Sequence, residues 1–175
     1  MMQHFILFLS VACCQALVAQ NTADVFDIAR KGTINQAKAV LTENPNAFDA
    51  INADGYSALI LASYRGNNPM AKFLVDNGCD INYMSGMGTA LMAAVAKNNL
   101  EVIEYLLDHK ADPNLADGNG TTALIYAATF KNHQAATLLV KAGANATTKD
   151  KRGNSATDYA ILADDDQLIQ ILKTK

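Results

Sequence analysis

Residues 89–114 read TALMAAVAKNNLEVIEYLLDHKADPN, a pattern of two short helices that recurs along the chain. Thr89 suits a helix N-terminus, because its hydroxyl accepts a hydrogen bond from an unpaired first-turn N–H group. An alanine-rich segment then runs to Asn98, a residue type that tolerates the left-handed backbone at helix ends. Apolar residues follow at the three-to-four-residue spacing of an amphipathic helix, at Leu100, Ile103, Leu106 and Leu107. We expect Leu106 and Leu107 to lie in the core between repeats.

The same pattern returns with a nearly constant period. The aligned triplets end in residues that are 32, 33 and 33 positions apart: Ser57-Ala58-Leu59, Thr89-Ala90-Leu91, Thr122-Ala123-Leu124 and Ser155-Ala156-Thr157. A glycine-bearing turn precedes three of the four triplets. A fixed period of roughly 20–50 residues indicates stacked repeats, in which each unit buries its apolar face against its neighbours. Residues 23–41 read as a degenerate first unit whose charged face, including Arg30, we expect to face water.

This pattern resembles the ankyrin repeat, a β-turn followed by two antiparallel helices. The resemblance is clearest where Leu106-Leu107 precedes Ala111-Asp112, and it covers about 150 of the 175 residues. It implies an all-α solenoid of about five helix-turn-helix units with short β-turn or hairpin projections. The repeat domain would span residues 20–175, with units at about 22–51, 52–83, 84–116, 117–149 and 150–175.

The chain departs from the family pattern in every unit. The family's proline is replaced by Ala58, Ala90, Ala123 and Ala156. The family's histidine, which hydrogen-bonds between turns, is replaced by Ile60, Met92, Ile125 and Asp158. We therefore expect packing to hold the turns together more than a polar network does. The turn at residues 83–88 is also one residue short, which predicts a different tip.

The first twenty residues carry no charged side chain, whereas all 31 acidic and basic residues lie downstream. Their apolar run of about ten residues has the length of a signal-peptide core and is too short to span a bilayer. This predicts a signal peptide over residues 1–19, a periplasmic or secreted bacterial protein, and no membrane insertion beyond that segment. Residues 1–4 lack Lys and Arg, so an uncleaved or lipidated membrane tether and a cytosolic location both stay open.

Composition and motifs argue against several function classes. A net charge of −3 and a pI near 5.5 disfavour nucleic acid as a partner, because phosphate binding needs clustered cations. The chain has no nucleophile, zinc-protease or phosphate-loop motif, so we predict no enzyme, cofactor or metal site. We expect a monomer. Cys79 reads as a packed thiol, with a redox sensor as the alternative.

The resemblance implies that the turns and the ends of the first helices line a concave face on which a protein partner binds. The residues that the fold leaves free there, and that we predict to bind the partner, are Tyr56, Tyr64, Arg65, Met84, Met87, Lys97, Asn119, Phe130, Lys151 and Arg152. Exposed aromatic residues are typical binding anchors. In the alternative interpretation, each aromatic ring covers the packing of a neighbouring turn.

The sequence thus predicts an exported, non-catalytic scaffold that binds an unidentified protein on its concave face. One alternative is an inhibitor or immunity-type protein that occludes an enzyme, which needs an interface of about 1,200–2,000 Å². Another is an auxiliary factor in oxidative-stress defence, which only the resemblance to small exported bacterial ankyrin-repeat proteins suggests.

Overall fold

The structure is a computed structural model that describes residues 24–173, so the predicted signal peptide at residues 1–19 lies outside the described residues. Within the described part, ten α-helices and one 3-10 helix follow one another. They are α2 (Val25–Lys31), α3 (Ile34–Glu43), η1 (Ala47–Asp49), α4 (Ala58–Arg65), α5 (Asn68–Asp76), α6 (Ala90–Ala96), α7 (Leu100–Asp108), α8 (Ala123–Thr129), α9 (His133–Lys141), α10 (Ala156–Leu162) and α11 (Asp166–Lys173).

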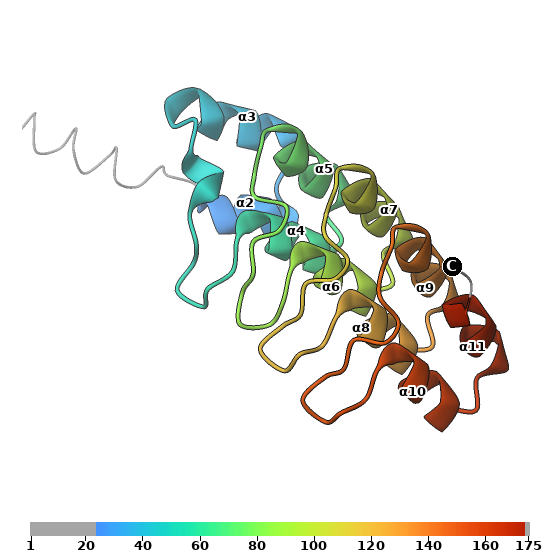
Figure 1. The fold of residues 1–175 in the computed structure, drawn as a ribbon. Coiled ribbons are helices and arrows are strands. Elements are labelled where there is room, and N and C mark those ends of the chain that lie inside the picture. The colour runs from blue at the N-terminus through green and yellow to red at the C-terminus, as the bar shows by residue number, and fades with distance from the viewer. Residues whose placement is uncertain (1–23, 174–175) are drawn as a thin grey trace, which may run out of the picture.

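The helices alternate between two rows (Figure 1). The even-numbered helices form an inner row beside the projecting loops, and the odd-numbered helices form an outer row. Each helix contacts its partner in the same unit and the equivalent helices of the neighbouring units. Residues 24–173 form isolated antiparallel bridges at the bases of the loops rather than a sheet. The predicted all-α solenoid of five helix pairs is confirmed.

The predicted helix starts and stops follow from local hydrogen bonding. In the inner helices α4, α6, α8 and α10, the capping side chain accepts a bond from an N–H group three residues on. These capping residues are Ser57, Thr89, Thr122 and Ser155. Gly66 ends α4 with φ at 74°, a left-handed conformation that glycine adopts without steric cost. Asn98 takes φ = 53° after α6, as predicted. The N-cap of α5 is Asn67, and the helix begins at Asn68 with Pro69 in its first turn.

The core lies between the two rows. Alanines at the inner-helix interfaces are fully buried, and their small side chains allow close approach of neighbouring helices. Met70 and Met92 belong to this core, and Leu106 is 1% exposed. Leu107 is only half-buried, which corrects the prediction that both leucines are core residues. Successive residues of an α-helix point about 100° apart, so adjacent leucines rarely share one buried face.

Side chains at the starts of the outer helices join neighbouring units. Asn67 donates to the backbone oxygens of Ala29 and Gly32 in the unit before it, at 3.2 and 3.0 Å. The side-chain amide of Asn99 donates to Asn68 at 2.6 Å, and that of Asn132 donates to Asn98 at 2.8 Å. Asn67, Asn99 and Asn132 are also the N-cap residues of α5, α7 and α9. The same residue type therefore begins each of these helices and links two units.

Hydrogen bonds also stabilise the projecting loops. Asp117 is buried and accepts from the N–H groups of Asn119 and Thr121 and from the Tyr126 hydroxyl. Asp150 repeats this arrangement in the last loop with Tyr159, whose hydroxyl holds the pKa of the Asp150 carboxyl below its usual value.

Successive loops are joined by polar contacts as well. The Lys151 N–H donates to the Asn119 oxygen at 2.9 Å, and the Tyr83 hydroxyl donates to the Gly55 oxygen at 3.2 Å. Hydrogen bonds between loops therefore accompany the packing between turns, and the expected dominance of packing stays a prediction. In the short loop, the antiparallel bridge joins Ser85 to Gly88, which are closer in sequence than the residues bridged in the other loops.

Candidate functional site

A groove of about 470 Å³ lies between the projecting loops and the inner helices of the first units. We call it the loop-side groove. Its buried apolar part is formed by Ile60, Leu61 and Met92 from α4 and α6. The ring of Tyr126 from α8 reaches the same groove from the next unit. An apolar groove with a few polar groups at its edge is the usual form of a binding site.

Four of the predicted binding residues line this groove: Tyr56, Tyr64, Arg65 and Met87. Tyr64 is 44% exposed and Met87 is 70% exposed, which is high for large apolar side chains. A fifth predicted residue, Lys97, sits with its ammonium nitrogen 4.1 Å from the centre of the Tyr64 ring. This cation–π contact joins the end of α4 to the residue that ends α6 in the following unit.

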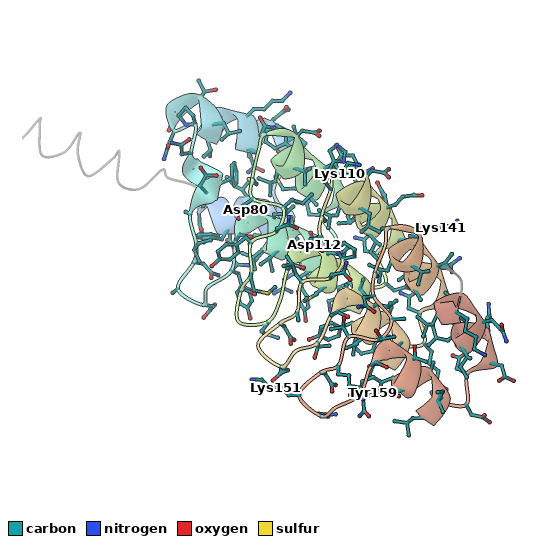
Figure 2. The ribbon with its side chains drawn as sticks, viewed as in Figure 1. Asp80, Lys110, Asp112, Lys141, Lys151 and Tyr159 are labelled. Carbon is teal, nitrogen blue, oxygen red and sulfur yellow. The ribbon has the colours of Figure 1, made fainter. Side chains whose placement is uncertain are left out.

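The other predicted binding residues lie outside the groove. Met84 is half-buried and packs against the core. Phe130 is 53% exposed and stacks on Tyr126 with ring centres 6.0 Å apart, beside a separate hollow near the start of α9. The remaining residues lie in the projecting loops, where Figure 2 shows Lys151 at a tip: Asn119, Lys151 and Arg152.

Two groove residues were missed by sequence reasoning. Arg30 was expected on the water-facing side of the first unit, but it lines the groove, and its guanidinium binds the Asp27 carboxylate at 3.1 Å. Arg30 precedes Tyr64 by 34 residues, so the repeat register itself was the missed signal. Tyr126 occupies the same helical position as Leu61 and Ala93, which also line the groove.

Comparison with known proteins identifies the repeat. A family model described as "Ankyrin repeats (3 copies)" matches residues 11–117 and 91–175. This chain belongs to the ankyrin-repeat family. Ankyrin repeats are generally protein–protein interaction modules, and ankyrin-repeat proteins are typically non-enzymatic scaffolds.

Two mammalian relatives contain a similar ankyrin-repeat segment. The chain is 35% identical over 151 residues to "Ankyrin repeat and SAM domain-containing protein 6" of Rattus norvegicus, and 34% identical to the protein of that name in Mus musculus. Each match covers 85% of this chain and 14% of the relative. The chain therefore spans about a seventh of the length of these relatives.

Within residues 24–173 of this ankyrin-repeat chain, no helix has the length and apolar character needed to cross a bilayer. The same part of the chain holds no group of three His, Cys, Asp or Glu side chains able to bind a metal ion.

Cys79 is half-buried in the ankyrin-repeat stack, with its sulfur 4.0 Å from the backbone oxygen of Phe48. Burial, and then the negative charge of Asp49, raise the pKa of the Cys79 thiol to about 11. Because only a thiolate attacks a disulfide reagent, this environment makes the sulfur less reactive at neutral pH than an exposed thiol. The structure thus favours the packed thiol over the redox sensor.

The reactivity of Cys79 is therefore expected to depend on folding and on pH. In a chain carrying Cys13→Ser and Cys14→Ser, Cys79 should react with Ellman's reagent at pH 7.5 about 100-fold more slowly when folded than in urea, given the two-unit rise in pKa. The folded rate should rise with each pH unit up to the pKa, as the thiolate fraction grows. Equal folded and unfolded rates would contradict the packed-thiol interpretation.

Proposed function

We propose that this ankyrin-repeat protein is a monomeric, non-catalytic scaffold that binds another protein in its loop-side groove. The observation that carries the proposal is the exposure of Tyr64 and Met87 beside a groove with an apolar floor. Exposed apolar groups that cluster rather than scatter mark interaction surfaces. Tyr, Met and Arg are also the residue types enriched at the centres of protein interfaces, and Arg65 completes that set here.

Replacing Tyr64 and Phe130 together by serine tests this proposal, because Tyr64 lines the groove and Phe130 stacks on Tyr126, another groove residue. Both side chains are largely exposed, so the change should alter the free energy of unfolding by about 0.5 kcal/mol or less per site. Partner capture, measured by affinity purification and quantitative mass spectrometry, should fall at least tenfold, because aromatic anchors typically contribute about 2 kcal/mol or more.

A matched control is available at the C-terminal end of the stack. Ile161 and Leu162 are 59% and 72% exposed, and neither lines the groove. The double change to serine at these two positions should leave capture intact. Unfolding of the Tyr64/Phe130 variant would show that the aromatics are packing residues, and unimpaired capture by a folded variant would place the partner elsewhere.

We further propose that the protein is exported, which the uncharged, apolar first twenty residues support. Mass spectrometry of the mature protein from a bacterial host should find Gln20 or a close neighbour at the N-terminus, in the periplasmic or secreted fraction. An intact Met1 in the cytosolic fraction would contradict export, and a lipid-modified cysteine at position 13 or 14 would identify a membrane-tethered form.

A further inference from the structure

Tyr64 lines the loop-side groove and also a second, polar hollow of about 540 Å³. Arg65 lines both spaces, and Lys97 lines the polar one together with amide side chains of Asn68, Asn98 and Asn99. The apolar groove and the polar hollow thus share Tyr64, and the Lys97 ammonium lies over the ring of this tyrosine. We call Tyr64, Arg65 and Lys97 the cationic wall.

The two cations of this wall have no carboxylate partner within residues 24–173. Among the nearby cations, Arg30 in the first unit pairs with Asp27 at 3.1 Å, and Lys72 in α5 pairs with Glu101 at 2.8 Å. The ion pairs of the described chain include neither Arg65 nor Lys97.

The carboxylates of the later loops are already engaged. Asp117 and Asp150 in these loops, and Asp158 in the first turn of α10, accept hydrogen bonds from backbone N–H and side-chain hydroxyl groups of their own units. Arg65 and Lys97 line the same hollow and have no carboxylate partner, so an outside anion can pair with both of them there.

The loop-side groove is also electrically polarised. A carboxylate, that of Asp54 in the loop before α4, lies at one end of the groove. Arg65, the last residue of the eight-residue helix α4, lies at the other end. At about 1.5 Å per residue, the helix separates the two ends by roughly 12 Å. An anion is repelled at the Asp54 end and attracted at the Arg65 end, so a bound segment has a preferred direction.

We propose that the partner presents an acidic peptide segment to this surface, an inference that rests on the function proposed above. An apolar side chain of the segment fills the loop-side groove, and an adjacent Asp or Glu carboxylate binds the cationic wall. The planar guanidinium of Arg65 suits a carboxylate because it donates two parallel hydrogen bonds. The exposed loop cations Lys149, Lys151 and Arg152 extend the same charge preference along the loop side.

A selection of random twelve-residue peptides displayed on phage, with the full-length chain as bait, tests this inference. Selected peptides should be enriched in Asp or Glu next to an aromatic or aliphatic residue. A fluorescein-labelled selected peptide, measured by anisotropy, should bind at least tenfold more weakly after its acidic residues are changed to Asn or Gln. The protein variant with Arg65→Glu and Lys97→Glu should bind the original peptide at least tenfold more weakly. In a new selection it should enrich basic peptides instead.

The matched control reverses two charges on the outer row, with Lys38→Glu and Lys141→Glu. Both lysines are exposed and unpaired with carboxylates, and Figure 2 shows Lys141 on an outer helix away from the loop tips. This variant has the same net charge as the Arg65/Lys97 variant, so it should keep the affinity and the acidic preference. If peptide affinity fell equally in the Arg65/Lys97 and Lys38/Lys141 variants, the cause would be long-range net charge, and the inference would be overturned.

The remaining outcomes separate this inference from the proposed function. Peptides that bind without acidic enrichment but lose affinity after Tyr64→Ser would overturn the acidic partner and keep the groove as the binding site. Binding that Tyr64→Ser leaves unchanged, or no selected peptide, would overturn both. Equal affinity for a fluorescein-labelled oligothymidylate of matched charge would indicate general attraction of polyanions and also overturn the inference.

Discussion

Replacing Leu106 by alanine is expected to lower the free energy of unfolding by about 2–5 kcal/mol. Leu106 lies in α7 of the central unit and is 1% exposed. Helix α7 contacts α6 in its own unit and both α5 and α9 in the neighbouring units. A cavity at this position therefore weakens contacts within the unit and at two interfaces, and each unit depends on such interfaces for its stability.

Urea unfolding followed by circular dichroism measures this loss. The matched control is Leu107→Ala, which removes the same atoms from a half-buried position and should cost clearly less. Hydrogen exchange of the Leu106→Ala variant should show faster opening in the central units first, because units contact only their neighbours. A loss below about 0.5 kcal/mol would contradict the central position of Leu106 in the core.

Replacing Asp117 by alanine is expected to cost about 1–3 kcal/mol, because a buried acceptor of several hydrogen bonds disappears. Its two carboxylate oxygens accept from the Asn119 N–H at 2.8 Å, the Thr121 N–H at 2.9 Å and the Tyr126 hydroxyl at 3.0 Å. Loss of these bonds releases the loop and frees the Tyr126 ring, one wall of the loop-side groove. The variant should therefore also bind the partner more weakly.

The chain itself supplies the control for this change. Asn52 occupies the equivalent position in the first loop, and its side-chain oxygen accepts from the N–H groups of Asp54 and Tyr56. Asp117→Asn should therefore keep the backbone bonds and lose less than about 1 kcal/mol in thermal or urea unfolding. If Asp117→Asn proved as damaging as Asp117→Ala, the negative charge rather than the hydrogen-bond geometry would hold the loop.

The sequence alone was enough for the architecture, because the deciding interactions are short-range and repeated. The caps at Ser57, Thr89, Thr122 and Ser155 bond to groups three residues away, so the triplets that revealed the period also mark the helix starts. Burial of Met70, Met92 and Leu106 follows from helical spacing in the same way. Four independent copies of one pattern reduced the ambiguity that a single short helix would have left.

Only the tertiary structure decided which side chains meet across the repeats. Lys97 reaches the Tyr64 ring, Asn132 reaches Asn98 and Tyr126 enters the groove of earlier units because stacking brings residues about 30 positions apart into contact. Such contacts depend on distances between units and on rotamers, which no residue's own neighbours in the chain determine. The same stacking left Arg65 and Lys97 without carboxylate partners and placed them beside an apolar groove, and this arrangement leads to the proposed acidic partner.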